Sequence, residues 1–325
     1  MINLRYHIVS PVAVFLALGM GIVMGSTVID RVTVDALNAK LDQVQNSTNG
    51  IRDDNGRLRG QVRQGEDFAA TTRDQLLRGH LRGVPVMIVA VSGVDKGPVD
   101  ELRDALITAQ ATVEGTVWFT SKMRLAGDGD IRALAGALDL AIAPADAVRR
   151  QALARLIVPR DTSTSAASVA EPSPLASLSA AGFVTYDPPP PVPPSTVGGT
   201  STATTVPPTL ASLPLAGTRY VVVSGAGAQV GDDLVAVPFV QAASQGLGRV
   251  VAVESGQDSD GGRAVFVGLL RGDAVVSTRV STVDNLESPM GQTATVLALE
   301  ELAVPRFGHF GVGPGAQRLL PAGRT

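Results

Sequence analysis

The sequence predicts an α/β protein with a single N-terminal transmembrane helix, a long coiled-coil helix, and a layered Rossmann-like α/β domain interrupted by a Pro/Thr-rich linker. Three observations support this fold class. No charged side chain occurs from Ile8 to Ile29. From Val34, apolar residues recur at alternating steps of three and four. Beyond Gly83, short apolar runs alternate with amphipathic stretches, as in strand–helix units around a parallel sheet.

We expect seven segments along the chain. They are a short tail over 1–7, a transmembrane signal-anchor over 8–29, a coiled coil over 30–82, the first half of the α/β domain over 84–187, a disordered linker over 188–217, the second half over 218–311, and a flexible tail over 312–325.

The first apolar segment is long enough to cross a hydrocarbon core of about 30 Å as a helix. A cleaved secretory signal ending near Val23-Met24-Gly25 is the alternative. Signal h-regions usually run about 7–15 residues, so the longer run favours a retained anchor. Arg5 on one side nearly balances Arg31 and Lys40 on the other, and the short N-terminal tail decides for a single-pass protein with its bulk outside the cytoplasm.

Small residues recur four apart in this span. Ala17, Gly21 and Gly25 form a small-xxx-small ridge, which lets two membrane helices approach closely. The alternative is that Gly and Ala are simply common in membrane helices. The heptads that follow favour pairing.

The coiled-coil seam has its strongest contacts in the first heptads. It runs through Val34, Leu37, Leu41, Val44, Thr48, Ile51, Asn55 and Leu58. Asn55 falls at an a position, where a buried amide fixes register and favours two strands. We expect a parallel homodimer, although a helix packed on its own domain or against another envelope protein fits the same pattern. Gly50, Gly56 and Gly60 each weaken the helix by about 1 kcal/mol.

The remaining chain alternates between predicted strands and helices. Predicted strands are Val86–Val91, Thr116–Thr120, Leu138–Ala143, Phe183–Tyr186, Tyr220–Val223 and Val250–Val253, and predicted helices are Pro98–Ala111, Asp146–Leu156, Pro238–Gln245 and Pro289–Leu302. Ser288 is the expected N-cap of the last helix. The units that begin at Val86 and at Tyr220 resemble each other and fit one shared sheet.

A glycine-rich loop is the strongest ligand motif. Gly225, Gly227 and Gly231 follow a strand, and Glu254 ends the next one, as in dinucleotide-binding folds. The spacing departs from that fingerprint, and Asp232-Asp233 would repel a phosphate. We therefore interpret the loop as a strand-to-helix turn, and the sequence does not decide whether it binds a ligand.

Composition excludes several classes of function. A net charge of −3 gives no electrostatic footprint for nucleic acid. The absence of cysteine excludes disulfides, zinc thiolates and Cys nucleophiles. The paired acids Asp128/Asp130 and Asp258/Asp260 lack the ligand spacing of an EF-hand and are expected in turns. With three scattered histidines, we expect no enzyme.

Copper is the one metal for which the sequence offers candidate ligands. Met20 and Met24 lie one helical turn apart in the span, and thioethers are soft ligands suited to Cu(I). Ordinary packing of two apolar side chains is the alternative.

Blocks at both ends of the chain resemble one family. Residues 2–10 (Ile-Asn-Leu-Arg-Tyr-His-Ile-Val-Ser), the run Val14–Gly19, and the blocks Ser281–Asn285, Val296–Glu300 and Gly308–Gly311 carry the resemblance. They are similar to the actinobacterial copper transport outer-membrane proteins of the MctB type, a family that includes SteB-type cell-separation proteins.

The resemblance implies two functions. One is copper transport or homeostasis at the cell envelope, possible copper binding included. The other is a non-enzymatic coiled-coil envelope scaffold that regulates cell separation and a peptidoglycan hydrolase. The resemblance implies a location in an outer membrane. Channels of such a membrane need strands of about ten residues that alternate between apolar and polar side chains. The short apolar strands here favour a plasma-membrane anchor and the scaffold.

Overall fold

The structure is a computed structural model that describes residues 4–157, 173–190, 210–215, 217–246, 249–256 and 265–322. The chain divides into two compact units, Met1–Gly65 and Glu66–Thr325. The first unit is helical, and the second holds the α/β domain. The predicted fold class is confirmed in its apolar N-terminal helix, its long helix and its α/β domain.

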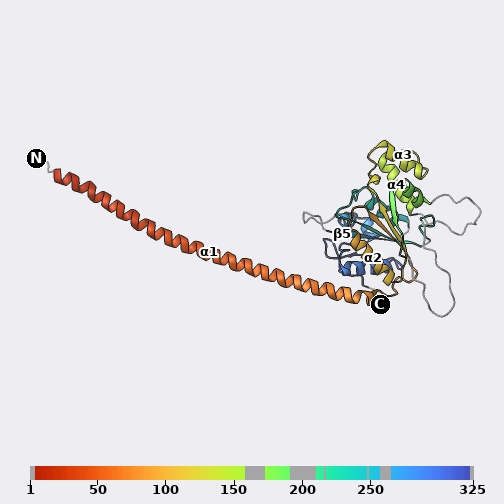
Figure 1. Cartoon of the computed structure of the whole chain (residues 1–325), viewed down its shortest axis with the longest axis horizontal. Coiled ribbons are helices and arrows are strands. Elements are labelled where there is room, and N and C mark those ends of the chain that lie inside the picture. The colour runs from red at the N-terminus through yellow and green to blue at the C-terminus, as the bar shows by residue number, and fades with distance from the viewer. Residues whose placement is uncertain are drawn as a thin grey trace, which may run out of the picture. The chain divides into compact units, whose positions relative to one another are not determined.

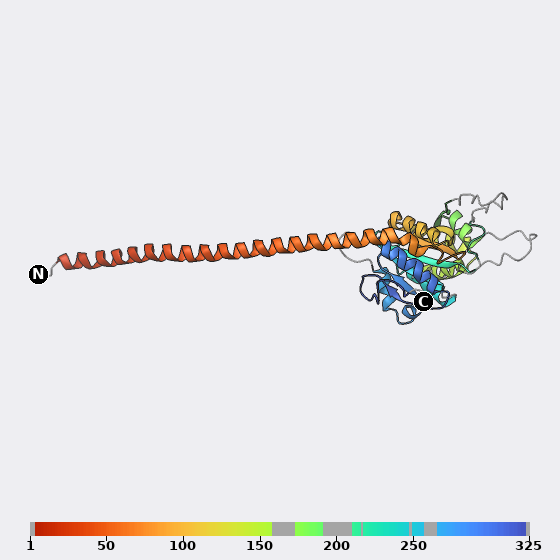
Figure 2. The same cartoon turned by 90° about the horizontal axis from the view of Figure 1, so that it is seen from below.

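Helix α1 runs without a break from Leu4 to Leu77, as the ribbon in Figures 1 and 2 shows. It contains the predicted membrane span, of which Ile8–Gly25 has a mean hydropathy of 2.2. The helix also continues through Gly50, Gly56 and Gly60, where the sequence predicts weakness.

The last turns of α1 and the turn that follows it belong to the second unit and pack into it. Leu77 and Leu81 are fully buried. Arg73 donates a hydrogen bond to Gln292, and His80 Nδ1 lies 2.7 Å from Glu300 Oε2. The end of the long helix is therefore fixed to the α/β domain by apolar burial and by polar contacts to one helix.

A seven-stranded sheet forms the centre of the described domain, with the order β3-β2-β1-β4-β5-β6-β7. The strands are β1 (Pro85–Val91), β2 (Thr112–Phe119), β3 (Val184–Asp187), β4 (Arg219–Gly225), β5 (Val250–Ser255), β6 (Ser281–Val283) and β7 (His309–Phe310). All neighbours pair in parallel except β2 and β3. The first six strands follow the order of a doubly wound nucleotide-binding sheet.

Helices cover both faces of this sheet. They are α2 (Lys96–Thr108), α3 (Asp128–Ala137), α4 (Ala145–Leu156), α5 (Pro174–Ala180), α6 (Ala236–Gly246), α7 (Phe266–Gly272) and α8 (Pro289–Glu301), with 3₁₀ turns at Ser121–Arg124 and Val276–Thr278. In Figure 1, α2 lies on one side of the sheet, and α3 and α4 lie on the other.

Strand β1 shows how the sequence produces two cores. Met87, Val89 and Val91 face the cluster with α3 to α7, whereas the alternate residues of the strand face the cluster with α2 and α8. Because successive side chains of a strand point to opposite faces, a continuous apolar run is needed when both faces are covered. The paired strands β1 and β4 begin the two similar units, which share one sheet as expected.

The predicted strand at Leu138–Ala143 is wrong. Leu138 ends α3, Asp139 has a φ of 50°, and Pro144 caps α4, so the run is a connection between two helices. The edge of β2 that another parallel strand would need is occupied by antiparallel β3. Of its apolar side chains, Leu138, Leu140 and Ala143 pack against the core, whereas Ile142 is 72% exposed.

Other local features agree with the sequence or add to it. Ser288 caps α8 by accepting a hydrogen bond from Gly291 N, as expected. Asp128 and Asp130, predicted in a turn, lie in the first turn of α3, where acids interact favourably with the helix dipole. Asp258 and Asp260 lie outside the described residues.

The two segments predicted to be unstructured are described in part. Residues 191–209 and 216 of the predicted linker lie outside the described residues. In the described part, Leu213 is fully buried and Leu210 packs against the core. At the other end, the predicted tail is described to residue 322, and Gln317 N donates to His309 O at 2.8 Å.

Candidate functional site

The glycine loop after β4 packs against the matching loop after β1. Gly93 and Gly227 have φ values of 100° and 82°. A Cβ added to Gly93 would lie 2.1 Å from Gly227 O, and Gln229 N donates to Ser92 O at 2.7 Å. These glycines allow two backbones to touch at the point where a doubly wound sheet would otherwise open for a ligand. This contact between the two loops supports the interpretation of the glycine loop as a strand-to-helix turn.

The acids beside this loop are also engaged. Asp232 Oδ1 accepts a hydrogen bond from Ser224 Oγ. Burial raises the pKa of Asp232, the Ser224 hydrogen bond opposes that change, and Asp233 adds to it. A dianionic phosphate would meet carboxylates here, so the loop gives no support to a nucleotide site.

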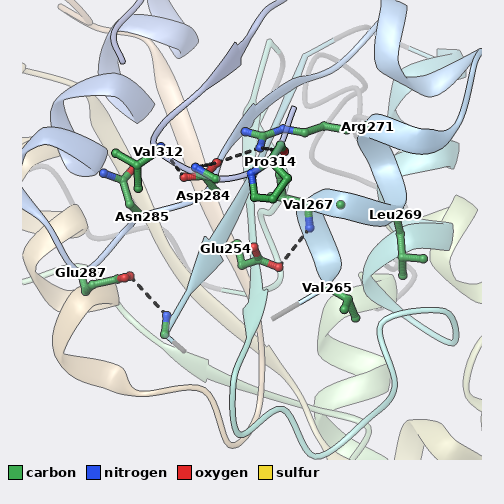
Figure 3. A pocket seen from close by; sticks show the side chains of 13 residues that line it. Glu254, Val265, Val267, Leu269, Arg271, Asp284, Asn285, Glu287, Val312 and Pro314 are labelled. Carbon is green, nitrogen blue, oxygen red and sulfur yellow. Dashed lines mark hydrogen bonds and ion pairs between the residues drawn. The ribbon is translucent and has the colours of Figure 1, made fainter. Parts of the chain in front are cut away.

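A pocket of about 360 Å³ lies instead one strand further along the sheet. Its polar residues come from the carboxyl ends of β5 and β6 and from α7, and Val312 and Pro314 close one side. Ligands of open α/β sheets bind outside the carboxyl ends of the strands, which is the position of this pocket. Figure 3 shows Glu254 between the Arg271–Asp284 pair and Val265.

Glu254 is the polar centre of the pocket. It is 7% exposed, and its Oε1 accepts a hydrogen bond from Val267 N at 3.2 Å. Burial raises its pKa to about 7; the Val267 hydrogen bond lowers it, and the negative charges of Asp232 and Asp284 raise it further. The carboxyl group therefore exchanges its proton near neutral pH.

Arg271 and Asp284 form a buried ion pair on the opposite wall. Arg271 Nη1 lies 2.7 Å from Asp284 Oδ2, and their side chains are 7% and 4% exposed. Arg271 also donates to the carbonyls of Phe310 and Pro314 at 2.9 and 2.8 Å. The guanidinium thus connects α7 to β7 and to the segment that follows β7.

The sequence pointed to one residue of this pocket and missed the others. Glu254 stands out as the acid at the end of a strand, although its partners are α7 and β6 rather than the glycine loop. Asp284 falls in one of the blocks that carry the family resemblance. Arg271 has no local signal, because an arginine in a short helix is ordinary.

The candidate copper ligands lie on the membrane helix. Met20 and Met24 are 63% and 70% exposed on α1, and they are separated by one turn. Among the described residues, no group of three or more His, Cys, Asp or Glu could hold a metal ion. His309 Nδ1 is 3.0 Å from Thr282 Oγ1, and burial lowers the pKa of that histidine.

The residues expected to mediate pairing are exposed along α1. Leu37, Leu41, Val44, Ile51 and Leu58 are between 51% and 61% exposed. Asn55 Nδ2 donates to Ile51 O at 3.0 Å within the same helix. Upstream, a Cβ added at Gly21 or Gly25 would meet no atom within 4 Å.

Comparison with known proteins places these features in a family. The family model "Copper transport outer membrane protein, MctB" matches residues 1–321. Proteins called copper transporter MctB in Mycobacterium tuberculosis and Mycobacterium bovis are each 26% identical to this chain over 330 residues, covering 97% of this chain and 98% of the relative. The match includes the apolar helix and the α/β domain alike. The chain therefore belongs to the MctB family of copper transport outer membrane proteins, as a membrane protein with one N-terminal hydrophobic helix.

Proposed function

We propose that this protein acts in copper transport or copper homeostasis at the cell envelope, anchored by its N-terminal helix with the α/β domain outside the cytoplasm. The observation that carries the proposal is the family match over residues 1–321, which includes both the N-terminal anchor and the α/β domain. The names of the mycobacterial relatives support the same function.

Copper is cargo in this proposal, and the membrane helix supplies the candidate contacts. Met20 and Met24 present two thioethers on one helix face, and a parallel pair of chains would present four. Thioether sulfur suits Cu(I) and leaves harder ions such as Mg²⁺ and Ca²⁺ unbound. We propose that these side chains bind copper transiently as it moves along the span.

The test is growth in copper of a strain that lacks this protein. Complementation with the wild-type chain should restore copper tolerance, and Met20→Leu/Met24→Leu should not. The double variant Val14→Leu/Ile22→Leu is the matched control, since it changes apolar side chains in the same span without removing a thioether. If the methionine variant restores full tolerance, these residues do not carry copper. If deletion leaves copper tolerance unchanged, the copper proposal itself is wrong.

The second candidate is a non-enzymatic coiled-coil scaffold that controls cell separation and a peptidoglycan hydrolase. The exposed apolar seam on α1 favours it, because a chain of large apolar side chains in water is expected to be covered by a partner. We propose a parallel homodimer as the first partner. The dimer surface could then receive another envelope protein.

One comparison separates the two functions. Leu41→Ala/Ile51→Ala disrupts the seam and leaves both methionines in place. Failure of cell separation with normal copper tolerance would favour the scaffold. Copper sensitivity with normal cell separation would favour copper transport. It would also contradict the hypothesis that the seam serves only a scaffold.

We also propose that the protein is not an enzyme. Two of its three histidines contact side chains of other elements, His80 with Glu300 and His309 with Thr282. The pocket arginine is tied to Asp284 and to two carbonyls. These groups support structure rather than a nucleophile and its base.

A further inference from the structure

We propose that the pocket at the carboxyl ends of β5 and β6 binds a small organic cation, a primary ammonium group carried on a short apolar body. The proposal does not depend on copper transport. It rests on three features of the pocket, which are the hydrogen-bonding groups it leaves available, its apolar walls, and the buried carboxyl group at its centre.

Carboxylates of the pocket already accept hydrogen bonds from several backbone N–H groups around it. Glu254 accepts from Val267 N, and Glu287 accepts from Gly256 N at 3.2 Å. Asp284 accepts from Val312 N and from Gly313 N, both at 2.8 Å. An anion entering here would find these backbone N–H groups occupied by carboxylates. A ligand that brings its own N–H donors would instead meet carboxylate oxygens.

The charge balance gives the same preference. Arg271 is the one cationic side chain among the described lining residues, and Asp284 neutralises it at 2.7 Å. Glu254 and Glu287 remain, so the pocket carries negative charge once Glu254 is ionised. In a half-enclosed site, such charge is screened less than at an open surface.

The walls of the pocket favour an apolar body for the part of the ligand beyond its ammonium group. Val265, Val267, Leu269, Val312 and Pro314 line the cavity with apolar surface. A volume of about 360 Å³ lies at the small end of ligand pockets, which run from about 300 to 1,000 Å³. A short alkyl chain would cover these side chains while its ammonium group reaches Glu254.

Binding should depend on pH through Glu254. With a pKa of about 7, the carboxyl is about one-tenth ionised at pH 6 and about nine-tenths ionised at pH 8. Asp232 after β4 and Asp284 after β6 raise this pKa, whereas Arg271 on α7 is already paired and Glu287 lies before α8. An ammonium ligand binds the ionised form, so its affinity should rise about tenfold between pH 6 and pH 8.

The experiment titrates the full chain in detergent with n-butylammonium by calorimetry or NMR at pH 6 and pH 8. The expected result is the tenfold rise in affinity for the wild type. Glu254→Gln should weaken binding at pH 8 about tenfold or more and abolish the pH dependence. Asp139→Asn is the matched control, because it removes one exposed carboxylate outside the pocket and should bind like the wild type.

A second variant keeps the test decisive if Glu254→Gln does not fold. Leu269 lines the pocket and is 47% exposed, so Leu269→Trp should fill the cavity and abolish binding without burying a new group in the core. The proposal is overturned if n-butylammonium does not bind, if it binds Glu254→Gln or Leu269→Trp as tightly as the wild type, or if n-butyrate binds better than n-butylammonium.

Discussion

Arg271 holds together several segments that are distant in the chain. From α7, it donates to Thr282 Oγ1 at 2.9 Å, to Asp284, and to carbonyls of β7 and the segment that follows. Burying an ion pair is costly unless its remaining donors are satisfied. Here the protein supplies these partners, so the pair can position the pocket wall.

Gly311 is required beside this pair. Its φ is 119°, and an added Cβ would lie 2.1 Å from Asp284 Oδ1. Gly311→Ala should therefore lower the free energy of unfolding by about 3 kcal/mol through strain and overpacking. Denaturant unfolding of the α/β domain measures this change.

Gly136→Ala is the control for that substitution. Gly136 lies in α3, and an added Cβ would meet no atom within 4 Å. Alanine is a better helix former, so this variant should gain up to about 1 kcal/mol. Equal effects of the two substitutions would show that neither the backbone conformation of Gly311 nor its contact with Asp284 opposes a side chain at this position.

Glu254 should make stability depend on pH. Its pKa rises from 4.5 to about 7 in the folded protein, so the unfolded chain loses the proton more readily. The fold therefore loses stability from this residue as the pH rises from 4.5 to 7. Since one pKa unit corresponds to 1.36 kcal/mol, the loss is at most about 3 kcal/mol.

Glu254→Gln removes that ionisation. We therefore expect the variant to gain stability relative to the wild type as the pH rises. The free energy of unfolding of the variant minus that of the wild type should be up to about 3 kcal/mol larger at pH 8 than at pH 4. Chemical denaturation at the two pH values measures it, and other titrating groups cancel in the difference. A difference that stays constant with pH would mean that Glu254 titrates normally.

At the scale of elements, α1 carries an apolar seam over its exposed length. The strongest part lies just beyond the Ala17/Gly21/Gly25 ridge. Two anchored helices that leave the same membrane face must run parallel, so the membrane contact and the seam would reinforce each other. Buried Leu-to-Ala changes cost about 2–5 kcal/mol where packing is good.

Leu41→Ala/Ile51→Ala should therefore abolish dimerisation of a soluble 30–325 fragment at micromolar concentrations. Asn46→Ala/Asp53→Ala, at two f positions of the same heptads, should leave dimerisation intact. Asn55→Ile should strengthen association and relax the choice between two and three strands. Sedimentation measures all four proteins. A wild-type fragment that stays monomeric at about 100 µM would contradict homodimerisation, because this concentration is well above the dissociation constant expected for such a seam.

At the scale of the whole molecule, the membrane span should remain in the mature protein. The apolar run exceeds the usual length of a signal h-region, and the heptads begin directly after it. Mass spectrometry of the protein from its own membrane should therefore find the original N-terminus. A new terminus near Ser26 would show that a signal peptidase removes the span.

The sequence determined the order of the large parts of this protein. Hydropathy places the span in α1 because a membrane helix requires a continuous apolar run, and that requirement is local. The same holds for the strands Pro85–Val91 and Arg219–Gly225, whose uninterrupted apolar residues follow from burial on both faces. Ser288 and Pro289 likewise predict the start of α8 from local chemistry.

Only the tertiary structure decided what the loops and single polar residues do. Leu138–Ala143 has the composition of a strand, but β3 occupies the sheet edge it would need. Gly227 belongs to a loop that resembles a ligand motif, but it packs against Gly93. Glu254 lies at the end of β5 and Asp284 follows β6, and they meet because parallel strands bring their carboxyl ends to one edge of the sheet, where Arg271 reaches Asp284 from α7. Pairing of distant segments depends on which edges and faces remain free, and no local pattern of residues encodes that.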